Sequence, residues 1–234
     1  MTSFIYQLDP YSMEFPSPNL ALDDPNGLLA VGGDLSPARL LSAYRNGIFP
    51  WFNEDEPPYW WSPSPRAVLF LNELHISKSF AKFLRKQSLT VSINNCFSEV
   101  IENCAVLRQQ EGTWITDEMM EAYTQLHHMG HAHSIEVWQD DELVGGLYGV
   151  LVGGCFCGES MFHKVTNASK LALVGLVNWL QHYGGTLIDC QIPNDHLLSL
   201  GVSTITREDY LEQLRCASLV RLPQEAFIAQ QIHY

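Results

Sequence analysis

Apolar residues recur every three or four positions in five segments of the chain, which is the spacing of an amphipathic helix. The first of these segments also has end signals. Ser36 or Asp34 can cap its start, Pro37 suits its opening turn, and Gly47 can end it. The pattern predicts helices over residues 34–47, 77–87, 97–104, 116–130 and 167–185.

Shorter apolar or alternating runs predict five strands, over residues 89–93, 133–139, 143–152, 155–162 and 186–192. The dipeptides Asp140-Asp141 and Gly153-Gly154 separate the middle three strands and favour tight hairpin turns. Two short helices complete the chain. The order of the elements predicts an α+β fold, an antiparallel meander followed by a helical crossover.

The segment over residues 49–65 contains Trp51, Trp60 and Trp61 and is rich in proline. Proline lacks a backbone donor, so this segment is predicted to lack regular structure. Two interpretations of the tryptophans stand side by side, a hydrophobic lid on the domain's own core and a platform for a ligand.

The chain of 234 residues is long enough for one large or two small domains, and its composition is that of a globular protein, with 46% hydrophobic and 17% charged residues. The change of pattern near residue 88 predicts an N-terminal domain over 1–88 and a second domain over 89–234. No apolar run approaches the ~20 residues that cross a bilayer, and the start lacks a signal-peptide pattern. We therefore expect a cytoplasmic protein with six reduced cysteines.

The net charge of −13 is unevenly distributed, because seven of the 13 Lys and Arg residues precede residue 90. Four of them lie on one side of the second predicted helix, opposite its apolar side: Lys78, Lys82, Arg85 and Lys86. Such a face is either an ordinary solvated surface or a stripe that faces phosphates.

The histidines at 127, 128, 131 and 133 are the obvious candidate for a metal site, since His127 and His131 would be one helical turn apart. No glutamate lies between them, however, and Gly130 should end the helix first, so no metal is expected. A nucleophilic thiol among Cys155, Cys157 and Cys190 is equally disfavoured, because all three fall on predicted strands. The sequence also lacks the glycine-rich motifs that bind nucleotide phosphates.

Polar residues interrupt two otherwise apolar strands. Glu159 and Ser160 lie in one, and Asp189 and Gln191 in the other, where the period of two places both on one face. A buried carboxylate is costly, so each acid needs either a salt bridge or a chemical role. Both interpretations remain open: a structural ion pair, or a polar site where the ends of two strands meet.

Several blocks of the sequence together resemble the leucyl/phenylalanyl-tRNA–protein transferase family. They are FPSP, PNGLLAVGGDLSPARLLSAYRNGIFPWF, WWSPSPRAVL, EGTWIT, GHAHSIEVW, LVGGLYGV, FCGESMF, NASK and LIDCQI followed by ND, and they span about Phe15 to Leu222. The resemblance implies transfer of Leu or Phe, and Met less well, from aminoacyl-tRNA to the α-amine of proteins that begin with Arg or Lys. The product would be a substrate for N-end-rule degradation. The implied fold is a small N-terminal domain on a domain similar to GNAT (acyl-CoA N-acyltransferase-like) enzymes, without acetyl-CoA.

The resemblance also implies roles for particular residues. Asp189 and Gln191 would orient the attacking amine, with Asp189 either accepting its proton or only holding it, and Glu159 would lie near the same amine. Ser160 and Asn194 would give polar support. The aminoacyl side chain would be held by Leu147, Phe156, Leu173, Leu176, Leu180 and Ile188. Relatives often carry aromatic residues where Leu176 and Leu180 stand, so the pocket is expected to be wider here.

Trp51 and Trp114 match family tryptophans near the terminal adenosine of the tRNA, and the basic stripe would then contact its acceptor stem. No metal or cofactor is expected, because an aminoacyl ester is already activated. The protein is expected to be a monomer with no membrane partner. The alternatives are a transferase that modifies peptidoglycan precursors and a non-catalytic adaptor for basic N-termini.

Overall fold

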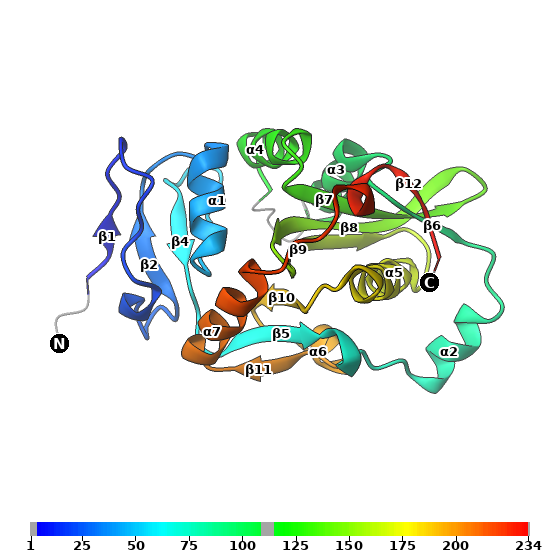
Figure 1. The fold of residues 1–234 in the computed structure, drawn as a ribbon. Coiled ribbons are helices and arrows are strands. Elements are labelled where there is room, and N and C mark those ends of the chain that lie inside the picture. Colours follow the sequence, from blue (N-terminus) through cyan, green and yellow to red (C-terminus); the bar gives the residue numbers. More distant parts are fainter. Residues whose placement is uncertain (1–3, 109–114, 234) are drawn as a thin grey trace.

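The computed structural model describes residues 4–108 and 115–233. They form a small sheet near the N-terminus and a large mixed sheet with helices on both faces (Figure 1). The small sheet has the order β1-β2-β4-β3, with β1 over Tyr6–Gln7, β2 over Leu28–Val31, β4 over Tyr59–Trp61 and β3 over Phe49–Pro50. A mixed α/β fold with an N-terminal unit is therefore confirmed.

The helix α1, Pro37–Arg45, lies between the two sheets and contacts both β3 and β8. Its N-cap is Ser36, whose hydroxyl accepts a hydrogen bond from the backbone N–H of Arg39. The predicted helix was right in type and position, because a capping serine, a proline in the first turn and an apolar stripe all point to the same element.

The prediction of no regular structure over 49–65 was wrong, because this segment supplies β3 and β4. The prolines are compatible with both strands. Pro50 lies in β3 at the edge of the sheet, and the pair Pro57-Pro58 precedes β4. Trp60 is fully buried in the core, as the first interpretation of the tryptophans expects. Trp51 is 43% exposed, and its role as a ligand platform stays a prediction.

The large sheet has eight strands in the order β11-β5-β10-β9-β8-β7-β6-β12. Their bounds are β5 Arg66–Phe70, β6 Thr90–Ile93, β7 Ala132–Gln139, β8 Glu142–Val152, β9 Cys155–His163, β10 Leu187–Gln191, β11 Ser203–Ile205 and β12 Gln230–Ile232. The meander β7-β8-β9 and the crossover to β10 agree with the sequence pattern. The turn residues Asp140 and Asp141 both have positive φ, as a tight hairpin requires.

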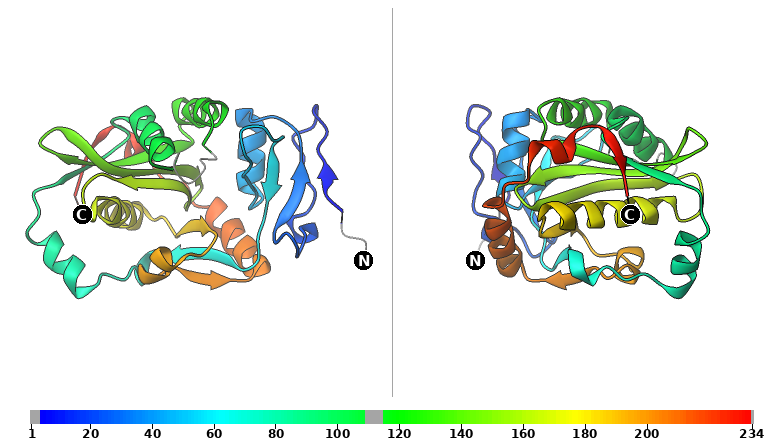
Figure 2. Two further views of the ribbon diagram at one scale, coloured as in Figure 1. Left: turned by 180° about the vertical axis from the view of Figure 1, so that it is seen from behind. Right: turned by 45° about the vertical axis from the view of Figure 1, so that its right-hand side comes forward.

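Two helices cover one face of the large sheet, α3 (Phe97–Arg108) and α4 (Asp117–His128). The long helix α5 (Ala168–Tyr183) covers the other face (Figures 1 and 2). The core is divided accordingly into one apolar cluster that extends into the small sheet and another beneath α5. The remaining helices lie at the periphery: α2 Lys78–Leu84, α6 Asp195–Ser199, α7 Arg207–Ser218, and the short 3-10 turns Pro18–Leu20, Leu71–Glu73 and Gln224–Phe227.

The strand β5 lies within residues 1–88 but pairs with β10 and β11 of the large sheet. The chain therefore enters the large sheet at Arg66, leaves it through α2, and returns at β6. The domain division at residue 88 stays a prediction. No helix in residues 4–108 or 115–233 is long and apolar enough to cross a membrane.

Candidate active site

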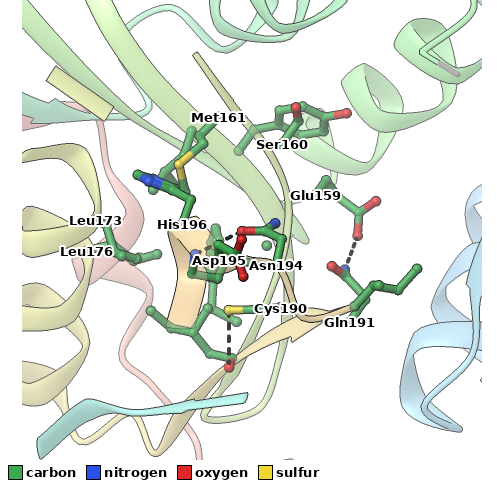
Figure 3. A pocket seen from close by; sticks show the side chains of 17 residues that line it. Glu159, Ser160, Met161, Leu173, Leu176, Cys190, Gln191, Asn194, Asp195 and His196 are labelled. Carbon is green, nitrogen blue, oxygen red and sulfur yellow. Dashed lines mark hydrogen bonds between the residues drawn. The ribbon is translucent and has the colours of Figure 1, made fainter. Parts of the chain in front are cut away.

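The strands β9 and β10 run parallel and pair over only three positions, from Leu187 opposite Cys155 to Asp189 opposite Cys157. Beyond this point a pocket of about 520 Å³ lies between β9, β10, α5 and α6 (Figure 3). Its apolar wall includes Leu147, Phe156, Leu173, Leu176 and Ile188, and its polar edge includes Glu159, Ser160, Gln191 and Asn194.

Five of the six predicted pocket residues therefore line one cavity. The sixth, Leu180, is fully buried in the core beneath α5 and is not among the lining residues. The reason is helical geometry, because Leu180 lies one turn beyond Leu176 and faces the sheet further from the pocket.

Asp189 is fully buried and forms a two-pronged ion pair with Arg66. Arg66 Nε donates to Oδ1 at 2.8 Å, and Nη2 donates to Oδ2 at 2.7 Å. The Tyr210 hydroxyl donates to the same Oδ2 at 2.8 Å, and the backbone N–H of Gln191 donates to Oδ1 at 3.0 Å. The interpretation of Asp189 as a salt-bridged acid is therefore confirmed.

Arg66 is also enclosed by aromatic rings. Its guanidinium lies 4.3 Å from the ring centre of Tyr210 and 4.9 Å from that of Phe49. Burial alone would lower the pKa of Arg66, but the Asp189 carboxylate raises it above its ordinary value. A buried ion pair of this kind is stable only when its hydrogen bonds are complete, and Asp189 receives them from Arg66, Tyr210 and the Gln191 backbone.

The expectation that Asp189 and Gln191 share a face of β10 was wrong. The pairing of β10 with β5 is irregular between these two residues, and Gln191 has φ of +55°. The regular alternation ends there, so the Asp189 carboxylate contacts Arg66 and Tyr210 while the Gln191 side chain lines the pocket.

Glu159 and Gln191 meet at the pocket's edge, where Gln191 Nε2 donates to Glu159 Oε1 at 3.1 Å (Figure 3). The second carboxyl oxygen accepts a hydrogen bond from the Tyr123 hydroxyl at 3.1 Å, and that hydroxyl is in turn hydrogen-bonded to the Tyr44 hydroxyl. Ser160, also on the edge, has a buried hydroxyl without a partner among the described residues.

Burial raises the pKa of Glu159 to about 7, and the negative charge of Asp189 adds to this effect. Hydrogen bonds from Tyr44 and Tyr123 and the charge of Arg66 oppose it. Glu159 is therefore a carboxyl group poised to gain or lose a proton near neutral pH.

Trp51 lies at the end of β3, and Trp61 Nε1 donates to its carbonyl oxygen at 2.7 Å. The two indole rings are 5.7 Å apart and tilted, which leaves part of Trp51 accessible to a ligand. Trp51 is not among the residues that line the pocket. Trp114 lies outside the described residues.

The four cations of the basic stripe are exposed on and after α2. No ion pair within residues 4–108 and 115–233 involves Lys78, Lys82, Arg85 or Lys86. On the opposite side of this helix, Phe80 is buried and stacks on Phe83. The predicted amphipathic arrangement is confirmed.

The histidine cluster does not converge on one point. His127 Nδ1 donates to the Ala132 carbonyl at 2.9 Å, while His133 is buried against Phe227. The described residues contain no group of three His, Cys, Asp or Glu side chains that could hold a metal. Cys155 and Cys157 are buried on β9, and burial raises the pKa of Cys190.

Four residues of the site were not identified from sequence: Arg66, Tyr210, Tyr123 and Tyr44. Arg66 gave the only available signal, a single cation at the start of the apolar run RAVLF. The tyrosines gave none, because a helical tyrosine with a buried ring fits any core pattern.

An apolar pocket with a carboxyl and a carboxamide at its edge fits an enzyme that transfers an acyl group bearing an apolar side chain. Comparison with known proteins gives the same class and narrows it. Residues 68–215 match the family model described as leucyl/phenylalanyl-tRNA protein transferase, and residues 33–64 match the model of that family's N-terminal domain.

Curated relatives cover nearly the whole chain. A leucyl/phenylalanyl-tRNA–protein transferase of Pectobacterium carotovorum subsp. carotovorum is 56% identical over 97% of this chain and 97% of its own. That of Idiomarina loihiensis is 54% identical, also over 97% of each. The chain belongs to the leucyl/phenylalanyl-tRNA–protein transferase family, and it is an aminoacyltransferase.

Solved structures are more distant. The structure of L-PGS from Bacillus licheniformis is 13% identical, with a TM-score of 0.39, and the match covers 82% of this chain and 63% of that one. A likeness at this level carries no conclusion about the fold or the substrate.

Proposed function

We propose that the protein transfers Leu or Phe, and Met less well, from aminoacyl-tRNA to the α-amine of proteins that begin with Arg or Lys. The product then carries a destabilising N-terminus. The observation that carries this proposal is the pocket itself, whose apolar wall adjoins Glu159 and Gln191.

The volume of about 520 Å³ accommodates a leucyl or phenylalanyl group and leaves room for the reacting ester. Leu173 and Leu176 extend from α5 toward the space (Figure 3). A wall of aliphatic side chains selects against polar aminoacyl groups, because such groups would lose their water without gaining hydrogen bonds.

The chemistry is the attack of an amine on an ester that is already activated. The amine nitrogen forms a bond to the carbonyl carbon, the bond from that carbon to the ribose oxygen breaks, the amine loses one proton, and the ribose oxygen gains one. Orientation of the two reactants supplies up to ~7–11 kcal/mol of the barrier. An α-amine has a pKa of about 7.7–8.0, so a modest base is sufficient.

Glu159 suits that task, since its pKa of about 7 lies close to the pKa of the amine. Gln191 would hold the amine or the ester through its carboxamide. Asp189 acts as a positioning residue, because its carboxylate is occupied by Arg66 and Tyr210 and reaches the site only through the Gln191 backbone N–H. Ser160 and Asn194 add polar groups at the same edge.

On the tRNA side, an exposed Trp51 offers a face for the terminal adenosine, and stacking of this kind is worth ~1–3 kcal/mol. The exposed cations Lys78, Lys82, Arg85 and Lys86 would contact phosphates of the acceptor stem. Trp114 would assist the adenosine.

We also propose that the domain over 89–234 is GNAT-like, supported by its order of antiparallel meander, crossover helix and parallel strand. The protein would act in the cytoplasm as a monomer without acetyl-CoA. The first 88 residues would form the N-terminal domain, apart from β5.

The test is an incubation of the protein with labelled leucyl-tRNA, a lipid-linked muropeptide and two acceptor proteins that differ only in their first residue, Arg or Ala. We expect label at the N-terminus of the Arg acceptor alone. Label on a lipid-linked muropeptide instead would support a peptidoglycan transferase. Binding of the Arg acceptor without transfer would support an adaptor, and either result would overturn the proposal.

A further inference from the structure

A second groove lies at one end of the large sheet and shares no residue with the aminoacyl pocket. It has a volume of about 1140 Å³ and lies between α1, the C-terminal ends of α4 and α7, and the turn Gln224–Phe227. Six basic or imidazole side chains line it: Arg45, His127, His128, His131, His133 and Arg221. None of its described lining residues is Asp or Glu, in a chain with a net charge of −13.

The hydrogen bonds around His133 determine which ring nitrogen carries its proton. The backbone N–H of Ser134 donates to Asn94 Oδ1 at 3.0 Å, which fixes the orientation of the Asn94 amide. Asn94 Nδ2 then donates to the Phe227 carbonyl at 2.7 Å and to His133 Nδ1 at 3.0 Å. Because Nδ1 accepts, the proton of a neutral His133 lies on Nε2.

His133 Nε2 has no hydrogen-bond partner among the described residues, although the side chain is only 3% exposed. Burial lowers the pKa of His133 to about 3, and His127 and His131 contribute to the lowering. The backbone carbonyl of Gly130 interacts with the ring and opposes this effect. At neutral pH the ring is therefore an uncharged donor on the wall of the groove, and an unpaired buried donor normally has a ligand or water as its partner.

Two arginines at the mouth of the groove supply positive charge. Arg45 and Arg221 are exposed, and neither takes part in an ion pair within residues 4–108 and 115–233. Burial lowers the pKa of His131, and the positive charge of Arg45 adds to this effect. The carbonyl ends of α4 and α7 also face this region, but capping N–H groups occupy several of these carbonyls, including His127 O and Ala217 O.

The rest of the groove is apolar. Leu151, Val152, Leu222 and Phe227 line it, and the Phe227 ring stacks on His133 with 4.1 Å between ring centres. Two guanidinium groups match the charge of a dianion, whereas these apolar surfaces match a hydrocarbon or aromatic body.

We propose that this groove binds a small phosphate monoester with an apolar body, whose phosphate is held by Arg45, Arg221 and the Nε2–H of His133. The site is separate from the transfer reaction, and its occupancy does not depend on the identity of the aminoacyl substrate.

The test uses phenyl phosphate as the probe, with inorganic phosphate and benzoate as comparisons, and measures affinity by calorimetry on the full chain. Arg45→Gln and Arg221→Gln should each weaken phenyl phosphate about tenfold, because each removes a charge-assisted hydrogen bond. Arg215→Gln is the matched control, since it removes an exposed arginine of α7 that does not line the groove. Leucyl transfer should be unchanged in all three variants, which shows that they fold.

A second measurement follows His133 directly by nitrogen NMR of histidine-labelled protein. Its signal is assigned as the one that is lost in His133→Gln. Phenyl phosphate should shift this Nε2 signal. The proposal is overturned if the double variant R45Q/R221Q binds as tightly as R215Q, if benzoate or inorganic phosphate binds as tightly as phenyl phosphate, or if the His133 signal does not move.

Discussion

The two carboxyl groups beside the aminoacyl pocket have opposite environments. Asp189 is paired with a buried guanidinium and two further donors, while Glu159 is held by a tyrosine hydroxyl and a carboxamide, both uncharged. The first accepts a hydrogen bond from the backbone N–H of Gln191 in β10. The second has a pKa of about 7 and can exchange a proton. The contrast supports the proposed roles, a positioning carboxylate beside a cation and a proton-exchanging carboxyl without one.

The largest expected effect comes from breaking the Asp189 ion pair. Arg66→Met leaves a buried carboxylate without a counter-ion, and we expect the free energy of unfolding to fall by about 3–5 kcal/mol. Denaturant unfolding followed by fluorescence measures the loss. The double variant Arg66→Met/Asp189→Leu should recover much of the stability, since it removes both charges.

Arg215→Met is the matched control, because the Arg215–Glu212 pair is exposed and should contribute little. If Arg66→Met unfolds at the same denaturant concentration as the wild type, the structural role of Asp189 is refuted.

Glu159→Gln should produce the next largest effect, and on catalysis rather than stability. It keeps the size of the side chain and removes the proton acceptor, so we expect kcat to fall about 100-fold. Transfer from a minimal leucyl-adenosine substrate measures the chemical step without tRNA binding. Equal rates in the variant and the wild type would show that Glu159 is not the base.

The same variant sharpens the comparison through pH. The folded pKa of Glu159, about 7, lies above its ordinary value of 4.5. The folded protein therefore binds more protons than the unfolded chain between these values, and the contribution of Glu159 to stability falls as pH rises from 4.5 to 7. It falls by up to about 1.4 kcal/mol per pH unit and is constant above pH 7.

The difference in unfolding free energy between the wild type and Glu159→Gln should change with that slope across this pH range. The rate of transfer by the wild type should also fall as pH drops below about 7. Part of this decline comes from protonation of the acceptor amine, and Glu159→Gln should show that part only. The additional decline in the wild type comes from protonation of Glu159. Parallel stability curves for the two proteins would contradict the raised pKa.

Much of this fold could be predicted from the sequence where local signals agreed. The helix α4 begins after its Thr116 cap and ends before Gly130, and β7, β8 and β9 follow their hairpin turns. The strand β5 could not be predicted in this way, because its residues are buried on both faces and show no alternation. Its partners β10 and β11 lie more than a hundred residues away, so no local pattern marks the pairing.

The site was predictable to a similar extent. Glu159 and Gln191 stood out as polar residues on apolar strands, and the structure joins them. The buried partner of Asp189 was not predictable, since Arg66 is 123 positions away. The proposed difference in role between the two acids depends on such distant partners, because they, rather than the strand sequence, set the charge environment.

Charge reversal on α2 should have a moderate effect that is confined to tRNA. Lys82→Glu/Arg85→Glu removes two exposed cations, so the affinity for leucyl-tRNA should fall about tenfold or more. Each lost phosphate contact should reduce the slope of log affinity against log salt by about 0.9. Turnover of leucyl-adenosine should be nearly unchanged, and Arg215→Glu, away from the stripe, should alter neither. Equal loss with both substrates would contradict a phosphate-binding role.

The smallest expected effect concerns the apolar wall of the pocket, which includes Leu173 and Leu176. Leu176 is buried and lines the pocket, so Leu176→Phe should fill part of the space that we propose for the aminoacyl side chain. One or two methylene groups in a hydrophobic pocket are worth ~1–3 kcal/mol. Because the pocket can partly repack, we expect the ratio of leucine transfer to phenylalanine transfer to rise about 3- to 10-fold.

Competing transfer from leucyl- and phenylalanyl-tRNA measures the ratio. Leu176→Met, which changes shape at nearly constant volume, should leave it unchanged. Glu159→Gln should slow transfer of leucine and phenylalanine equally and therefore leave their ratio unchanged. If Leu176→Phe also leaves the ratio unchanged, the apolar wall does not determine which side chain is transferred.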